Sequence, residues 1–225
     1  ATDGRYNTPP ACLPFFNGRH ELKFIDNDFH NYDHALHVGY VKQYRPRYAT
    51  VRDLMTERQC RDAGIEFYSF SQVMEFAYEI GEYAERVIVI PKYDCMDTIP
   101  SDFVLGYSIP TRYGGTPLPI EAFKGRPVHL LGGSWTQQRN ALEILGDDVI
   151  SVDNNQIQLL SNYGTFYVSD GSTRQLSELG LGSITNPGVI AFTMSAGAMA
   201  AGLKEVMGET MIEEQQEVND DASRG

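Results

Sequence analysis

The sequence predicts an α/β protein built as a single (β/α) barrel of the TIM-like type, in a truncated or irregular form. Short apolar runs alternate with segments of helical spacing along most of the chain. Residues 127–155, PVHLLGGSWTQQRNALEILGDDVISVDNN, contain a complete β-α-β unit, which requires two parallel strands. The length of 225 residues suits one barrel domain. An open doubly wound sheet is the main alternative.

The β-α-β unit opens with the apolar run 128–131, which is long enough for a buried strand and too short for a helix. Gly132 and Gly133 interrupt this run and allow positive φ, and Ser134 is a suitable helix N-cap. The apolar residues of 135–145 then share one helical face. A second strand follows, with a carboxylate at its tip.

The remaining elements are expected in the same alternation. Seven strands are predicted, at 23–28, 48–54, 65–70, 86–93, 103–109, 128–131 and 149–152, with an eighth from 165–169 or from a chain end. Helices are predicted at 31–44, 56–64, 71–84, 120–124, 135–145, 156–163 and 189–206. The barrel domain therefore spans 23–207, after an irregular lead-in (1–22) and before an acidic, flexible tail (208–225).

Composition limits the function classes. The formal charge of −12, with thirteen Arg among eighteen basic residues, counts against a generally basic nucleic-acid-binding surface. No apolar run reaches the ~18 residues of a membrane span, and no signal-peptide pattern is visible. Cys12, Cys60 and Cys95 form neither a CxxC zinc pattern nor a disulfide framework. We expect a cytoplasmic protein (host cytoplasm if viral) without a metal or membrane partner; homo-oligomerisation stays open.

Carboxylates stand at several predicted strand tips. They are Asp26, Asp28, Asp53, Asp94 and Asp153. Parallel strands would bring these side chains to one mouth, where neighbouring carboxylates divide the roles of acid and of base or nucleophile. Each could instead cap a helix or a turn, which is the simpler interpretation of any one of them.

Two loops add binding candidates. The GGS sequence at 132–134 is either a phosphate site on backbone N–H groups or a plain tight turn. In YSIPTRYGGT, Arg112 lies between Tyr107 and Tyr113; aromatic rings stack on bases and Arg pairs with phosphate, although an ordinary surface loop fits too. The helical spacing of His30, His34 and His37 permits a metal site, but a solvated helix face is the preferred interpretation.

Three stretches resemble tRNA-guanine transglycosylases, over roughly residues 23–167. The β-α-β unit at 127–155 resembles the last such unit of that family, KFIDND resembles a strand that ends in a DSGG-like motif, and FVLGYSIP resembles a Gly-rich strand that lines the base pocket. The short phage and archaeal-virus relatives that insert deazaguanines into DNA are the nearer match. The zinc site of the tRNA enzymes has no counterpart here, and NDF replaces glycines after Asp26.

This resemblance implies a base-exchange transglycosylase that replaces guanine in a nucleic acid, DNA rather than tRNA, with a 7-deazaguanine. It implies that Asp153 is the nucleophile, that Asp26 or Asp28 acts in acid–base chemistry, and that Gly106 and Tyr107 lie beside the base. Nucleic acid and a free purine or deazapurine base are the implied partners, and no cofactor is needed. Two alternatives stay open: a barrel enzyme acting on a small phosphorylated or glycosidic substrate, and an inactive barrel that serves as a binding or particle-associated protein.

Overall fold

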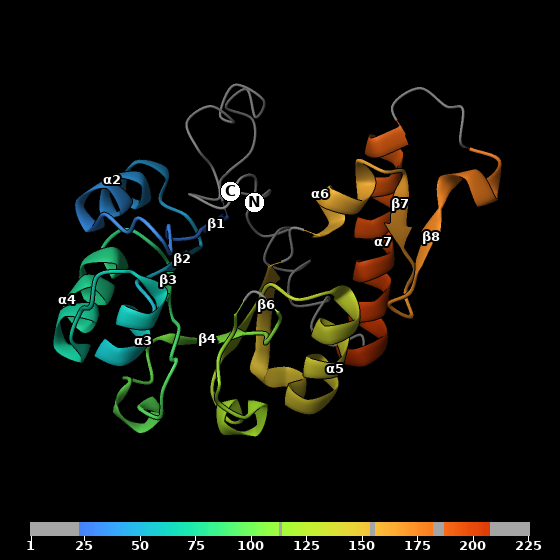
Figure 1. Cartoon of the computed structure of the whole chain (residues 1–225). Helices are drawn as coiled ribbons and strands as arrows, with labels where there is room; N and C mark the ends of the chain where they lie inside the picture. Colours follow the sequence, from blue (N-terminus) through green and yellow to red (C-terminus); the bar gives the residue numbers. More distant parts are fainter. Residues whose placement is uncertain (1–22, 113, 154–155, 182–186, 208–225) are drawn as a thin grey trace, which may run out of the picture. The chain divides into compact units, whose positions relative to one another are not determined.

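The computed structural model describes residues 23–112, 114–153, 156–181 and 187–207 (Figure 1). The lead-in predicted at 1–22 and the tail predicted at 208–225 lie outside the described residues. Contacts group the chain into two compact units, Ala1–Leu131 and Gly132–Gly225. The boundary between them falls inside the β-α-β motif, directly after its first strand.

The first unit contains a parallel sheet whose strands follow one another in chain order. Its strands are β1 (Phe24–Ile25), β2 (Tyr48–Thr50), β3 (Arg86–Val89), β4 (Val104–Ser108) and β5 (Val128–Leu131). Because all five run in the same direction, their carboxyl ends lie along one edge of the sheet. That edge carries the loops in which the sequence places most candidate residues.

Helices connect these strands, and side-chain caps define where they begin. They are α2 (His34–Tyr44), α3 (Glu57–Ala63), α4 (Phe70–Gly81), and the short 3-10 helices η2 (Met96–Thr98) and η3 (Ile120–Phe123). Thr56 and Ser69 each form a capping box with the Gln three residues later, which satisfies backbone donors of the first turn of α3 and α4. Helix α4 packs against α2 and β3 (Figure 1).

The strand predicted at 65–70 is wrong, because residues 65–69 form the connection between α3 and α4 and residue 70 begins α4. Gly64, at φ 67°, ends α3 in the left-handed conformation that favours glycine. Ser69 then caps α4 only five residues later. Two helix boundaries this close leave no room for a paired strand, and the side chain of Phe67 is 43% exposed.

The second unit begins with the rest of the β-α-β motif and ends in helices and a hairpin. Its elements are α5 (Trp135–Leu145), η4 (Gly146–Asp148), β6 (Val149–Asp153), α6 (Gln156–Ser161), β7 (Thr165–Tyr167), β8 (Thr173–Gln175), η5 (Leu176–Leu179) and α7 (Pro187–Met207). The segment suggested as an eighth parallel strand, 165–169, instead supplies β7, which pairs antiparallel with β8. Phe166, Leu176 and Ala191 form the core between this hairpin and α7.

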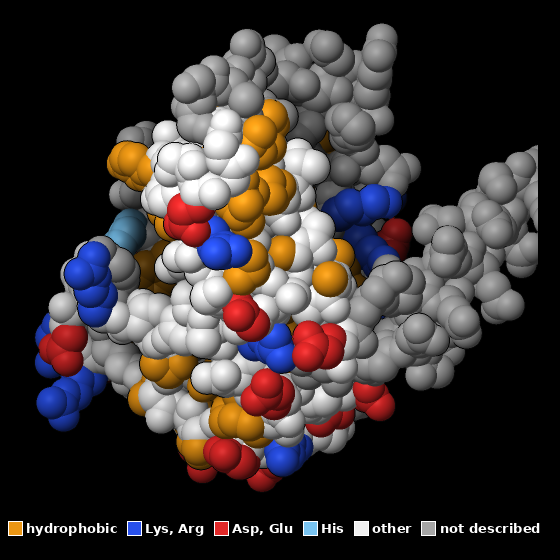
Figure 2. All heavy atoms as spheres, turned by 90° about the vertical axis from the view of Figure 1, so that its right-hand side faces the viewer, with side chains coloured by type: hydrophobic (Ala, Val, Ile, Leu, Met, Phe, Trp, Pro, Cys, Tyr) orange, Lys and Arg blue, Asp and Glu red, His pale blue; other side chains and the backbone are white. Residues whose placement is uncertain are grey.

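Part of the second unit's surface is apolar. Among the described residues of this unit, the exposed large apolar side chains include Leu159, Tyr163, Leu179 and Phe192. Figure 2 shows hydrophobic side chains gathered among polar and charged ones on the face that it presents. None of the described helices combines the length and the apolar character that a membrane span needs.

The architecture confirms the α/β class and the parallel sheet. It also confirms the predicted strand–turn–helix sequence of the β-α-β unit, with boundaries within one residue of those expected.

Candidate functional site

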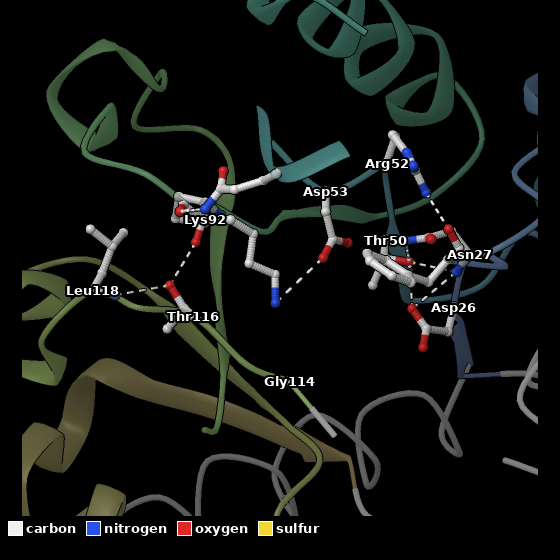
Figure 3. A network of polar contacts seen from close by, with 12 residues as sticks. Asp26, Asn27, Thr50, Arg52, Asp53, Lys92, Gly114, Thr116 and Leu118 are labelled. Carbon is white, nitrogen blue, oxygen red and sulfur yellow. Dashed lines mark hydrogen bonds and ion pairs between the residues drawn. The ribbon is translucent and has the colours of Figure 1, made fainter. Parts of the chain in front are cut away.

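A hydrogen-bond network fixes Asp26 at the carboxyl edge of the first unit's sheet (Figure 3). The Thr50 hydroxyl donates to Asp26 Oδ1 at 2.7 Å, and the Asn27 backbone N–H donates to the same oxygen at 3.0 Å. The register of β1 and β2 explains this contact: Ile25 pairs with Ala49, so the next residues, Asp26 and Thr50, are neighbours. Asp26 is half-buried, whereas Thr50 is fully buried.

Asn27 stands directly after Asp26, where the resembling family has a glycine, and the fold accommodates its side chain. Its side chain is only 6% exposed and turns inward between β1 and β2. Its Nδ2 donates to the Val51 carbonyl at 2.8 Å and to Thr50 Oγ1 at 3.1 Å, and its backbone N–H lies 2.7 Å from the same hydroxyl. The Asn side chain is therefore part of the network that holds Asp26.

Asp28 organises the turn that leads to α2. Asp28 is 4% exposed, and its Oδ1 accepts hydrogen bonds from the backbone N–H groups of His30, at 3.1 Å, and Asn31, at 3.0 Å. This is an Asx-type turn, in which a carboxylate satisfies backbone donors two and three residues later. The geometry gives Asp28 a structural task that differs from that of Asp26.

Arg52 stabilises the same turn through hydrogen bonds to backbone carbonyl groups. Arg52 is 2% exposed, and its guanidinium donates to the carbonyl oxygens of Phe29, at 2.5 Å, and Glu66, at 3.2 Å. The guanidinium carbon also lies 5.3 Å and 5.7 Å from the ring centroids of Phe29 and Tyr32, which is cation–π geometry. The chain after Asp28 is thus tied to the segment that directly follows β2.

Asp53 is engaged in a buried ion pair with Lys92. The carboxylate Oδ2 lies 3.5 Å from Lys92 Nζ, and the two side chains are 8% and 10% exposed (Figure 3). Asp53 follows β2 and Lys92 follows β3, so the pair spans two neighbouring strand ends. Gln59 Nε2 donates to the Lys92 carbonyl at 2.7 Å, which fixes the backbone there. The charge of Asp53 is therefore compensated within the protein.

The histidines of α2 serve the packing of the first unit. His37 is fully buried, its Nε2 lies 2.7 Å from the Thr50 carbonyl, and burial lowers its pKa from 6.5 to about 4, so the neutral ring donates this hydrogen bond. His34 lies 2.7 Å from a Glu79 carboxylate oxygen and stacks on Phe76. Within the described residues, no group of three His, Cys, Asp or Glu side chains is arranged to hold a metal.

Gly106 and Tyr107 of β4 lie in the core. A Cβ placed on Gly106 would be 2.7 Å from Ile90 Cγ1 and 2.9 Å from Leu131 Cδ1. The packing around Gly106 therefore leaves no room for a side chain. The Tyr107 ring is 8% exposed and meets Phe123 edge-on at 5.0 Å, and burial raises its pKa. In this conformation Tyr107 offers no open stacking face.

The loop after β4 holds Arg112 at the surface. Thr111 and Gly114 exchange backbone hydrogen bonds of 2.7 Å and 3.2 Å, which makes a tight turn with Arg112 exposed inside it. The predicted stacking residue Tyr113 lies outside the described residues. Thr116 closes this loop, because its hydroxyl donates to the Pro91 carbonyl at 2.9 Å (Figure 3).

In the second unit, the GGS turn has the predicted backbone. Gly132 and Gly133 have φ values of 67° and 74°, which L side chains rarely adopt. Ser134 caps α5: its hydroxyl accepts from the Gln137 N–H at 3.2 Å, and Gln137 Oε1 accepts from the Ser134 N–H at 2.9 Å. The prediction of a positive-φ turn followed by an N-cap is confirmed.

Gln138 joins this turn to Asp153, the last residue of β6. Its fully buried side-chain amide donates to the Gly132 carbonyl at 3.0 Å and to the Asp153 carbonyl at 2.7 Å. The Gly132 N–H also donates to the Asp153 carbonyl, at 3.2 Å. The backbone carbonyl of the predicted nucleophile thus accepts two hydrogen bonds, and the Asp153 side chain is half-buried.

The structure thus groups the predicted residues by unit. The first unit brings Asp26, Asp28 and Asp53 to one sheet edge, and the second brings Gly132, Gly133 and Ser134 to Asp153. Sequence reasoning missed the residues that hold these positions, namely Asn27, Thr50, Arg52, Lys92 and Gln138. A signal existed for two of them, since Arg52 and Lys92 are charged residues within apolar runs, which indicates buried partners.

Comparison with known proteins identifies one relationship. The model of a family described as a family of unknown function (DUF6610) matches residues 12–186. No curated protein and no solved structure matches the chain.

Proposed function

Because the chain belongs to this family of unknown function (DUF6610), its activity has to be inferred from its own residues, and we propose that it is a base-exchange transglycosylase. It replaces guanine in a nucleic acid, DNA rather than tRNA, with a 7-deazaguanine base. The observation that carries this proposal is the Asp26 carboxylate, fixed by Thr50 and Asn27 at the carboxyl edge of a parallel sheet. This carboxylate belongs to the motif that resembles the base-recognition strand of guanine transglycosylases, a resemblance that also implies a truncated (β/α) barrel.

The chemistry proceeds in two balanced displacements. An Asp153 carboxylate oxygen attacks C1′ of the nucleotide, the C1′–N9 bond breaks, and its electron pair leaves with guanine, which Asp26 protonates. The nucleotide is then held as a glycosyl ester of Asp153. In the second displacement Asp26 takes the N9 proton of the incoming deazaguanine, whose nitrogen attacks C1′ and releases the Asp153 carboxylate. The base must leave the helical stack for both steps.

The bonding of the other carboxylates supports this division of roles. Asp28 accepts hydrogen bonds from the backbone of its own turn, and Asp53 is paired with Lys92. We assign the acid–base work to Asp26 because it stands in the motif that resembles the base-recognition strand of guanine transglycosylases. Asp153 is suited to attack because its backbone is fixed by Gln138 while its side chain is half-buried at a strand tip.

Incorporation of labelled base tests the proposal. The full chain is incubated with guanine-containing DNA, with tRNA and with free guanosine, each together with radiolabelled guanine or a 7-deazaguanine. Label is expected in DNA, and it is expected to vanish in Asp153→Asn and Asp26→Asn. Asp147→Asn, which alters an exposed carboxylate near the start of β6, is the matched control and should incorporate like the wild type.

The outcomes separate the alternatives. Label in neither polymer, across a range of salt concentrations, would refute base exchange. Turnover of free guanosine alone would indicate an enzyme acting on a small glycosidic substrate. Binding of DNA without incorporation would indicate the inactive binding protein.

A further inference from the structure

We propose that Thr50 is a positioning residue: its hydroxyl donates to Asp26 Oδ1 and so fixes the orientation of the Asp26 carboxylate for proton transfer. The hydrogen-bond assignment follows from geometry alone, and its catalytic meaning rests on the proposed function. Thr50 carries no predicted role in the sequence, because a threonine inside a β-strand is common. Its importance comes from the atoms that surround its hydroxyl.

The orientation of the Asn27 amide follows from its neighbours. One terminal atom of the amide lies 2.8 Å from the Val51 carbonyl oxygen, which can only accept. If that atom were the amide oxygen, two acceptors would face each other in a buried site. The group that faces Val51 is therefore the NH₂ group, and the same NH₂ group lies 3.1 Å from Thr50 Oγ1.

The direction of the Thr50 hydroxyl follows from this assignment. A threonine hydroxyl has one hydrogen to donate and two lone pairs. The Asn27 backbone N–H, at 2.7 Å, and the Asn27 NH₂ group, at 3.1 Å, both point donors at the oxygen and occupy its lone pairs. The single hydroxyl hydrogen is left for the third neighbour, Asp26 Oδ1, at 2.7 Å.

These hydrogen bonds fix the direction of the Asp26 carboxylate. Oδ1 accepts from the Thr50 hydroxyl at 2.7 Å, and the single hydrogen of the Asn27 N–H, 3.0 Å away, is shared between Oδ1 and Thr50 Oγ1. The Thr50 hydroxyl hydrogen, in contrast, is directed at Oδ1 alone. Loss of this donor weakens the hold on the carboxylate and changes its orientation at the sheet edge.

The His37 ring, which holds the Thr50 backbone, keeps its neutral state near neutral pH. The Thr50 carbonyl accepts from the buried, neutral ring of His37 at 2.7 Å, and Thr50 pairs with Ile88 of β3. Burial holds the pKa of His37 at about 4, so the ring remains a neutral donor above about pH 5. Thr50 is therefore fixed on both sides.

Thr50→Val and Thr50→Ser provide the test. Valine has nearly the same shape without the hydroxyl; the Asn27 N–H keeps Asp26 Oδ1 and one hydrogen of the NH₂ group keeps the Val51 carbonyl, while the other hydrogen loses its Thr50 partner. Serine retains the hydroxyl. Thr116→Val is the matched control, since Thr116 is also buried but its hydroxyl donates to the Pro91 carbonyl. Thr50→Ala serves as a second variant for removing the hydroxyl.

Two readouts are measured on the full chain. Infrared difference spectra, with Asp26→Asn used to identify the Asp26 carboxylate band, should show that band shifted in Thr50→Val and near its wild-type position in Thr50→Ser and Thr116→Val. In the base-exchange assay kcat should fall about 10- to 100-fold in Thr50→Val, as for loss of a hydrogen bond to a charged group, with KM little changed. Thr50→Ser should restore most of kcat.

The two ideas fail in different ways. An Asp26 band at the same position in wild type, Thr50→Val and Thr50→Ala would overturn the positioning role, whatever the enzyme does. A shifted band in a protein that exchanges no base would keep the hydrogen-bond assignment and refute the proposed function. A wild-type kcat in Thr50→Val would also overturn the positioning role.

Discussion

Replacing Gly106 by alanine tests whether this glycine serves packing or leaves room for a ligand. An added Cβ would lie 2.7 Å from Ile90 Cγ1, 2.9 Å from Leu131 Cδ1 and 3.0 Å from Ile88 Cγ2. Carbon atoms in contact prefer separations of about 3.5–4.0 Å, so the new atom overlaps with three side chains at once. Overpacking of this kind costs about 1–3 kcal/mol, and we expect Gly106→Ala to lower the free energy of unfolding by that amount.

Urea unfolding of the full chain, followed by circular dichroism, measures this change. Gly39→Ala is the matched control, because Gly39 lies inside α2 and a Cβ there meets nothing within 4 Å. Alanine favours the helix over glycine by up to about 1 kcal/mol, so the control should stabilise the protein. The two Gly→Ala changes therefore have opposite expected signs. A Gly106→Ala protein as stable as the wild type would refute the packing argument and favour an open space beside Gly106.

Three further changes probe buried polar groups. Gln138→Met removes a buried donor from two carbonyl groups and should lower the free energy of unfolding by about 2–4 kcal/mol in a urea titration, whereas exposed Asn140→Met should change it by less than about 0.5 kcal/mol. Lys92→Met leaves the Asp53 carboxylate buried without its partner and should cost about 3 kcal/mol, while Lys92→Met combined with Asp53→Leu should recover most of that loss; equal stability of the single and double variants would contradict this. His37 has a pKa of about 4 in the fold and 6.5 as its ordinary value, so the unfolded chain binds more protons between these values, and His37 contributes a loss of stability of roughly 1.4 kcal/mol per pH unit as the pH drops through this window. His37→Gln should reduce the slope by about this amount, measured as urea midpoints at pH 7, 6 and 5, while buried His129, whose pKa is lowered to about 3, keeps its own contribution.

The β-α-β unit could be predicted from sequence because each of its signals is local. An apolar run, two glycines, a capping serine and a helical apolar face stand next to one another in the chain, and each specifies its own backbone conformation. The strand expected at 65–70 failed for a local reason too. Its apolar residues suggested a strand, but the caps at Gly64 and Ser69 fix two helix boundaries around them.

The residues that position the candidate site could not be predicted, because their partners are distant in sequence. Thr50 meets Asp26 only through the register of β1 on β2, which the sequence does not specify in strands of two and three residues. Gln137 and Gln138 are adjacent on α5. Gln137 caps the helix and Gln138 is buried, and which of the two is buried depends on how the helix is oriented. Tyr107 packs edge-on against Phe123, a residue of another element of the chain.

The burial of Arg52 bears on how this acidic protein tolerates changes in ionic strength. A net charge of −12 gives a self-repulsion that depends on dissolved salt, and exposed ion pairs weaken as salt rises. Arg52 is held by two backbone carbonyl groups and two aromatic rings within a buried site, where ions in solution have little influence. The turn after Asp28 can therefore keep its shape in dilute buffer and in concentrated salt alike, even while the outer charge of the molecule is being screened.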